Sequence, residues 1–150
     1  MKYLSIIYAL FFLGCSSISP ISTKSKEYAG SVPKSYIDRL DFHGEELIVV
    51  PDMGNYYYVH KNGKKMLALT YKGTADKFSE GLARTKVEGK IGFFNKNLEM
   101  VLQPLYDFAF PFYKGKAEIC TGCKESPVDG TMMLDGGTWK KIDRSGLIIE

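Results

Sequence analysis

Short runs in which hydrophobic and polar residues alternate make up most of the chain after residue 46. The plainest run is 83–88, where Ala83, Thr85 and Val87 alternate with charged residues. A period of two places one face of a β-strand in the core and the other in water, so we expect Arg84 on the solvent face. No stretch after residue 15 places apolar residues convincingly at helical spacing. The pattern therefore predicts an all-β fold with no long helix apart from the leader.

Turn residues divide these runs into separate strands. Asn62-Gly63 is the strongest hairpin signal, because both residues tolerate positive φ. Residues 28–42 are ambiguous: Val32-Pro33 disfavours an early helix, while 35–40 could form one helical turn capped by Ser35. The predicted strands span residues 47–50, 56–60, 65–71, 83–87, 91–97 (where the strand enters a turn), 100–102 and 116–120.

One motif, Phe-x-x-Gly-x-Ala, occurs twice in the chain, 34 positions apart (112 − 78). A fixed period in this range is typical of a repeat architecture, in which neighbouring units bury one another's apolar faces. We expect each glycine to reverse the chain after the bulky phenylalanine, since glycine adopts positive φ without steric cost. The members of the motif are Phe78, Gly81 and Ala83, then Phe112, Gly115 and Ala117.

Further segments around this motif resemble the WG beta-repeat family. Residues 89–96 match the signature Gly-Lys-Trp-Gly-Tyr-Ile-Asp, with Gly92 kept and Ile91 in the tryptophan position, and residues 103–107 match the Pro and Tyr-Asp spacer. Trp139 supplies the tryptophan of a last unit, which Gly146 closes. The Trp-Gly pair is incomplete in every unit, so the repeats are degenerate: Lys140 replaces the glycine after Trp139, and Tyr56-Tyr57 replace both residues in the first unit.

This resemblance implies stacked antiparallel hairpins or three-stranded units. We place units at about 56–83, 84–120 and 138–150 within a β-repeat domain spanning 28–150, and expect an inserted loop at 121–137. The resemblance carries architecture and says little about activity, because such families are defined by fold rather than chemistry.

The start of the chain has the pattern of an export signal. Lys2 precedes an apolar run at 3–13, which is too short to span a bilayer as a helix and suits a signal-peptide core. Gly14-Cys15 then resembles the lipobox of bacterial lipoproteins, although Phe12 stands where leucine is usual. The resemblance implies cleavage after residue 14 and acyl chains such as palmitate on Cys15. An ordinary secretory leader with an incidental cysteine is the alternative.

Residues 15–27 are rich in serine and poor in large apolar residues, so we expect a flexible tether after the signal peptide of residues 1–14. Ser16 after Cys15, under the sorting rules that the lipoprotein resemblance implies, favours the periplasmic face of the outer membrane in a bacterial envelope.

The formal net charge is +3, which is too small and too evenly spread for a nucleic-acid interface.

Cys120 and Cys123 form a C-x-x-C motif in a chain that we expect to be exported. A disulfide suits an oxidising compartment and is the main interpretation. A redox-active dithiol would need a helix N-terminus beside a βαβ unit, which the β-rich surroundings do not provide. Half of a zinc site, which would lack its other ligands, and a pair of free thiols remain as alternatives.

Known catalytic constellations are missing from the sequence. Of the two histidines, His43 belongs to no motif and His60 occupies a turn position that suits capping. The aromatic runs 56–58 and 108–113 are interpreted first as core, although outward rings could form a binding platform.

We therefore expect no enzyme, no cofactor and no metal. The main hypothesis is a membrane-anchored envelope lipoprotein that binds a protein or cell-wall partner without catalysis. The alternatives are a periplasmic thiol-disulfide oxidoreductase that uses Cys120 and Cys123, and a glycan or peptidoglycan binder that uses exposed tyrosines.

Overall fold

The computed structural model describes residues 28–149. Nearly every regular element is a β-strand, which confirms the predicted all-β class. Among the described residues no helix has the length and apolar character to cross a membrane. The elements are β1 (Ala29–Ser31), α1 (Lys34–Ile37), β2 (Leu47–Asp52), β3 (Asn55–His60), β4 (Lys64–Ala68), β5 (Thr70–Tyr71), β6 (Thr74–Ala75), β7 (Leu82–Val87), β8 (Lys90–Asn95), β9 (Met100–Tyr106), β10 (Phe108–Ala109), β11 (Lys116–Val128) and β12 (Thr131–Asp143).

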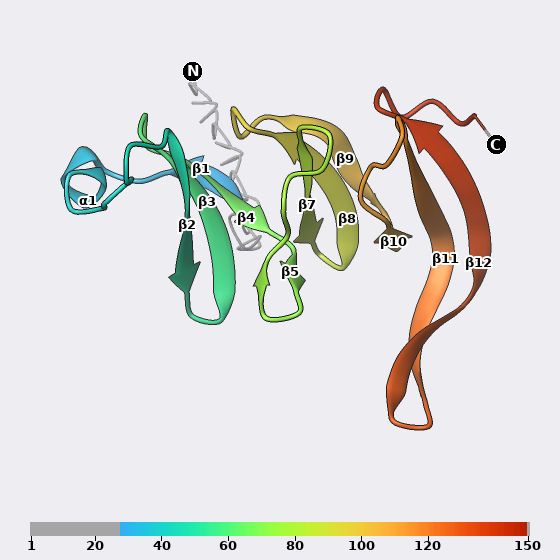
Figure 1. Ribbon diagram of the computed structural model, residues 1–150. Helices are drawn as coiled ribbons and strands as arrows, with labels where there is room; N and C mark the ends of the chain where they lie inside the picture. The colour runs from blue at the N-terminus through green and yellow to red at the C-terminus, as the bar shows by residue number, and fades with distance from the viewer. Residues whose placement is uncertain (1–27, 150) are drawn as a thin grey trace, which may run out of the picture.

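Antiparallel sheets follow one another in chain order, as Figure 1 shows from left to right. The first has the order β1-β4-β3-β2, the middle one β7-β8-β9 and the last β10-β11-β12. A small hairpin, β5–β6, lies between the first and the middle sheets in the chain. Because neighbouring strands are mostly consecutive in sequence, each sheet is a local unit, as a repeat architecture requires.

The two copies of the repeated motif form the same turn. Glu80-Gly81 and Lys114-Gly115 both have positive φ at each residue, which is the conformation of a type I′ hairpin turn. The Ser79 N–H donates to the Leu82 carbonyl at 2.8 Å, and the bond from Tyr113 to Lys116 has the same length. The predicted reversal of the chain at Gly81 and Gly115 is confirmed.

The turn at Asn62-Gly63 differs from its prediction. Only Gly63 has positive φ, whereas Asn62 uses its side-chain oxygen to accept the Lys64 N–H at 3.0 Å. The connection is therefore a three-residue loop, closed by a hydrogen bond from the Gly63 N–H to the His60 carbonyl at 2.9 Å. Asparagine stabilises this turn with its side chain rather than with a left-handed backbone.

The core divides into two clusters, one on each face of the middle sheet. Phe93 and Phe94 are adjacent on β8, so their side chains point to opposite faces. Phe94 packs against Phe78 at 5.6 Å between ring centroids, and Phe93 packs against Phe112 at 4.9 Å. The repeated phenylalanines share one kind of contact, because Phe78 also packs against Tyr58 on β3, at 4.8 Å, as Phe112 does against Phe93 on β8. They differ in burial, since Phe112 is buried and Phe78 is partly buried.

The predicted loop at 121–137 is wrong. These residues continue β11 and β12, which pair from Lys116 with Asp143 to Val128 with Thr131. Asp129-Gly130 forms another type I′ turn, and Asp-Gly is a sequence signal for such a hairpin. The outer part of this hairpin, residues 124–135, projects away from the sheets at the lower right of Figure 1 and is called the arm below.

The remaining expectations concern the N-terminal third. The predicted helical turn at 35–40 is observed slightly earlier, as α1, and Pro33 rather than Ser35 occupies its N-cap without a side-chain hydrogen bond. Proline suits this place because the first N–H groups of a helix have no partner within it. The predicted signal peptide of residues 1–14 and the tether lie outside the described residues.

Candidate binding site

A cleft of about 540 Å³ lies beside the middle sheet. One wall is the β5–β6 hairpin, which carries Tyr71, and the other is the segment 108–111, which carries Phe108, Phe110 and Pro111. Tyr71 and Phe110 are about half exposed. Concave sites with aromatic walls are the usual form of ligand-binding sites.

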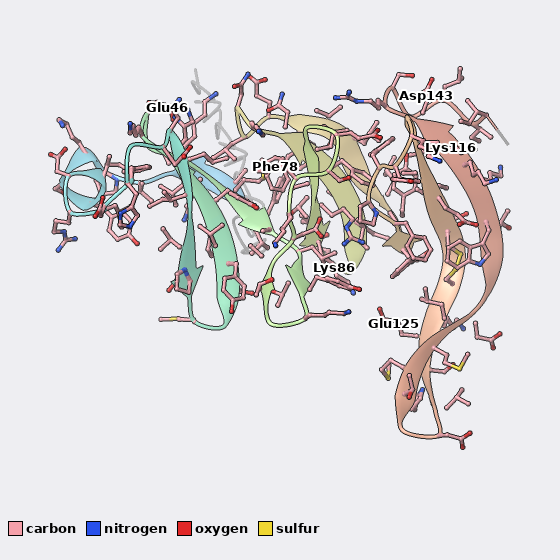
Figure 2. The ribbon with its side chains drawn as sticks, viewed as in Figure 1. Glu46, Phe78, Lys86, Lys116, Glu125 and Asp143 are labelled. Carbon is pink, nitrogen blue, oxygen red and sulfur yellow. A yellow bond between two sulfur atoms is a disulfide. The ribbon has the colours of Figure 1, made fainter. Side chains whose placement is uncertain are left out.

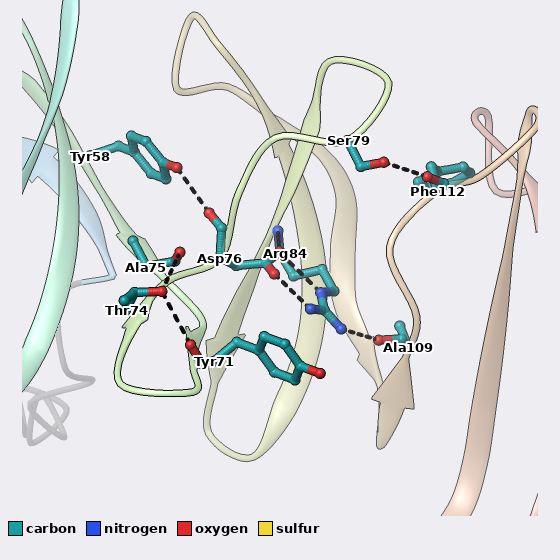
Figure 3. A network of polar contacts seen from close by, with 9 residues as sticks. All are labelled: Tyr58, Tyr71, Thr74, Ala75, Asp76, Ser79, Arg84, Ala109 and Phe112. Carbon is teal, nitrogen blue, oxygen red and sulfur yellow. Dashed lines mark hydrogen bonds and ion pairs between the residues drawn. The ribbon is translucent and has the colours of Figure 1, made fainter.

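The floor of the cleft holds a buried ion pair, drawn in Figure 3. Arg84 on β7 and Asp76 are only 4% and 5% exposed. Arg84 Nη2 lies 2.6 Å from Asp76 Oδ1, and Arg84 Nε lies 3.0 Å from Asp76 Oδ2. This bidentate geometry offsets the desolvation free energy of burying both charges.

Arg84 also connects the two walls of the cleft. Its Nη1 donates to the Ala109 carbonyl at 2.7 Å, on the side of β10. Its guanidinium lies 5.7 Å from the centre of the Tyr71 ring, on the opposite wall, within the range of a cation–π contact. The buried arginine therefore fixes the spacing between Tyr71 and β10.

Asp76 is held from its backbone as well. The Tyr58 hydroxyl donates to the Asp76 carbonyl at 2.9 Å. Burial, and to a smaller extent the negative charge of Asp76, raise the pKa of the Tyr58 hydroxyl above its ordinary value. Tyr58 therefore stays protonated and remains a hydrogen-bond donor at neutral pH.

Most of the other polar side chains of the cleft already bond to the protein. The Ser79 hydroxyl donates to the Phe112 carbonyl at 2.6 Å, and the Thr74 hydroxyl lies 3.3 Å from the Tyr71 carbonyl. The exposed cations on the rim are Lys72 and Lys77, and the single carboxylate in the lining, that of Asp76, is neutralised by Arg84. The cleft consequently offers aromatic surface and positive charge.

Trp139 extends the aromatic surface onto β12. Its ring centre lies 6.0 Å from that of Phe108 and 6.2 Å from that of Phe110. The aromatic run at 108–113 divides between core and surface, because Phe112 is buried while Phe110 and Tyr113 are exposed. In the tyrosine run at 56–58, Tyr58 is buried and the other two are half-buried.

The structure joins Cys120 and Cys123 in a disulfide on β11, with Cα atoms 6.0 Å apart. Side chains three residues apart on a regular strand point to opposite faces, so the regular alternation must be interrupted between the two cysteines. Gly122, with a φ of 79°, makes that change. Opposite it, a Cβ on Gly137 would come within 2.7 Å of both sulfur atoms, so only glycine leaves room for the disulfide.

Asp107 fastens this region to the middle sheet. One carboxylate oxygen bonds to Lys90 Nζ on β8, and the other accepts the Gly122 N–H at 2.6 Å. The bonds from Lys90 and from Gly122 hold the pKa of the Asp107 carboxyl below its ordinary value. The aspartate of the predicted Tyr-Asp spacer therefore links the middle sheet to the start of the arm.

The histidines do not form a site. The Asn62 N–H donates to His60 Nδ1 at 3.1 Å, so the predicted turn-capping role of His60 is confirmed. His43 lies in an exposed loop, 3.1 Å from Asp41. Within residues 28–149, no three His, Cys, Asp or Glu side chains are grouped so that they could hold a metal ion.

Burial of Arg84 is the feature that the sequence analysis missed. We expected Arg84 on a solvent face of an alternating strand, but every residue from Leu82 to Thr85 is buried. The reason is that the middle sheet is covered on both faces, so alternation does not separate core from solvent there. An arginine in a strand that is buried on both faces needs an acidic partner. The sequence alone did not identify Asp76 as that partner.

Comparison with known families adds one finding. The family model described as "WG containing repeat" matches residues 58–90 and 91–122. The matched units are shifted from the predicted boundaries at 56–83 and 84–120, and the predicted last unit at 138–150 lies outside them. No curated protein and no solved structure matches the chain.

Proposed function

Because this chain is a protein with WG-containing repeats, we propose that it is a non-catalytic binding module held on a bacterial envelope membrane through a lipid on Cys15. The observation that carries the binding role is the cleft between Tyr71 and Phe110. Its aromatic walls are partly exposed, while its buried polar groups bond to one another. Such a site favours partners with apolar side chains.

The arrangement favours binding over chemistry. General acid–base catalysis needs a titratable group within reach of a substrate and not already committed. Asp76, the carboxylate of the lining, has both oxygens bonded to Arg84. The rim lysines attract anions but have no paired base among the lining residues.

The two alternative functions receive less support. A dithiol oxidoreductase site is usually placed at a helix N-terminus, which lowers the thiol pKa, whereas Cys120 and Cys123 lie on β11. A glycan has many hydroxyl groups that need hydrogen-bond partners, whereas the Ser79 and Thr74 hydroxyls already have partners. A protein partner is therefore the occupant that fits the cleft best.

The membrane anchor rests on the sequence of the leader, which lies outside the described residues. Metabolic labelling with a fatty acid should mark the wild-type protein, and a Cys15→Ser variant should lose the label and leave the membrane fraction. A Cys123→Ser variant is the control and should keep the label. Continued labelling of Cys15→Ser would contradict the anchor.

The binding role is tested by crosslinking in intact cells. The reagent is a short photo-crosslinker that does not require an amine or a carboxyl group on the partner. Phe110→Ala removes an aromatic wall and should reduce partner capture by about tenfold, as loss of a central aromatic contact does at other interfaces. Tyr113→Ala removes another exposed aromatic ring, one that lies outside the cleft, and is the control. Equal capture by both variants would rule out the cleft.

A further inference from the structure

The arm exposes several large apolar side chains to solvent. Val128, Met132 and Met133 are 45%, 61% and 52% exposed. A two-stranded hairpin is marginally stable by itself in water, and large exposed apolar side chains commonly mark an interaction surface. The arm therefore has the properties of a segment that packs against another surface.

Apolar residues occupy both faces of the arm. Met132 pairs with Pro127, and Met133 pairs with Ser126, so the two methionines point to opposite faces of the hairpin. A flat partner could cover only one of these faces. A receptor for this arm needs two walls, and the cleft between β5–β6 and residues 108–111 has two.

The chemistry of the two surfaces is complementary. The arm contains three acidic residues, Glu125, Asp129 and Asp135, and one basic residue, Lys124, so its net charge is negative. The cleft has Lys72 and Lys77 on its rim and aromatic rings on its walls. Methionine makes favourable contacts with aromatic rings, and opposite charges at the rim guide association.

Within one copy these surfaces do not meet. The arm begins beside the middle sheet, where Glu125 lies 3.9 Å from Lys86, as the labels in Figure 2 indicate. The lining of the cleft contains no residue of the arm. Both surfaces are thus open in the same chain.

We propose that the arm of one copy inserts its tip into the aromatic cleft of a second copy. This inference rests on the proposed role of the cleft as a protein-binding site, and it names the partner. The contact joins two different surfaces, so it is heterologous, and each copy keeps one unused arm or cleft for the next copy. Copies held on one membrane would therefore form short rows or rings.

The test uses the full chain in cell membranes, with a photoreactive benzophenone amino acid in place of Phe110. Illumination should give a product of twice the mass of the chain, in which the crosslink maps to residues 124–135. Met132→Ser with Met133→Ser should lower the yield about tenfold or more, because it removes the apolar side chains that would contact the aromatic walls. Met53→Ser, which changes an exposed methionine at the β2–β3 turn, is the control and should leave the yield unchanged.

Two differently tagged chains provide a second readout that does not depend on one variant. One chain carries the two changes at Met132 and Met133 in the arm, and the other carries Lys72→Glu with Lys77→Glu in the cleft. Each variant expressed alone should fail to form the crosslinked dimer. Expressed together, they should form it again, since one supplies an intact cleft and the other an intact arm. Failure of this mixture, or a crosslink outside 124–135, would overturn the inference.

The same experiment separates the two proposals. Crosslinks from position 110 to a different protein, lost in the lysine variants, would overturn self-association and retain the cleft as a binding site. Absence of any crosslinked product would contradict both.

Discussion

Gly92 in the middle unit and Lys140 in the last unit occupy the same place in the repeat. Each lies three positions before a residue that caps the following turn, Asn95 and Asp143 respectively (95 − 92, 143 − 140). A Cβ on Gly92 would come within 2.7 Å of the Leu102 carbonyl oxygen, whereas Lys140 is an exposed side chain on β12. Equivalent positions therefore have opposite steric requirements.

The difference shows why the repeat has a glycine at this position. Gly92 has no unusual φ, so its own strand does not require glycine. It is needed because β9 is irregular opposite it and brings Pro104 close to β8. In the last unit, the residues after the turn make a single bridge, from Ile142 to Ile148, and leave room for Lys140. The glycine of the repeat is therefore required by contact with the following strand. It is replaced in the last unit, where that contact is smaller.

The largest contrast between the two units should be in core packing. Phe93→Ala removes a ring that is 1% exposed and should reduce the free energy of unfolding by about 3–5 kcal/mol, because it leaves a cavity. Met133→Ala, in the arm, should change it by less than about 0.5 kcal/mol. Urea unfolding followed by circular dichroism measures both, and similar losses would show that the arm is part of the core.

Much of this contrast could be predicted from the sequence. The spacing of Phe78 and Phe112 predicted a shared kind of packing, and the glycines at 81 and 115 predicted the turns, because bulky apolar residues and positive-φ positions are local properties. The arm was missed because its strands carry exposed residues on both faces, so they lack the alternation by which a half-buried strand is recognised.

The candidate site was less predictable than the fold. Its walls come from β5 and from residues 108–111, which are far apart in sequence and meet only through the stacking of units. The pairing of Arg84 with Asp76 likewise depends on the path between them, in which Asp76 reaches back toward β7. Among the residues of the cleft, the sequence pointed to Phe78 as a member of the repeated motif and to the aromatic run at 108–113 as core or platform.

A direct test of the comparison is to place a methyl group at the two equivalent positions. Gly92→Ala should cost about 1–3 kcal/mol in unfolding free energy, because backbone atoms of Leu102 and Pro104 must move away. Lys140→Ala should stay within about 0.5 kcal/mol of wild type. An equally mild effect at both positions would contradict the role assigned to β9.

The disulfide should have a smaller effect, confined to the last unit. Cys120→Ser with Cys123→Ser opens a loop of very few residues, so the loss should be below about 2 kcal/mol. Amide hydrogen exchange should become faster at 121–137 and stay unchanged in β7 and β8. A global acceleration would indicate instead that the disulfide stabilises the whole domain.

The smallest expected effect concerns two aspartates. Asp107 connects the units through Lys90 and Gly122, whereas Asp143 bonds within one turn, to Ser145 and Leu147. The pKa of each carboxyl is lowered on folding, Asp107 chiefly by its bond from Lys90 and Asp143 chiefly by its bond from the Ser145 hydroxyl.

A pKa that is lower in the folded state means that the ionised form stabilises the fold. This stabilisation is complete above the ordinary aspartate pKa, about 3.9, and is lost as the pH falls through the lowered folded value. Asp107→Asn and Asp143→Asn should therefore be less stable than wild type near neutral pH and approach it in acid. Hydrogen exchange near neutral pH should distinguish the two variants, since Asp107→Asn should loosen Gly122 at the start of the arm and Asp143→Asn only residues 143–147. If Asp107→Asn left Gly122 protected, the carboxylate would not be what joins the middle unit to the arm.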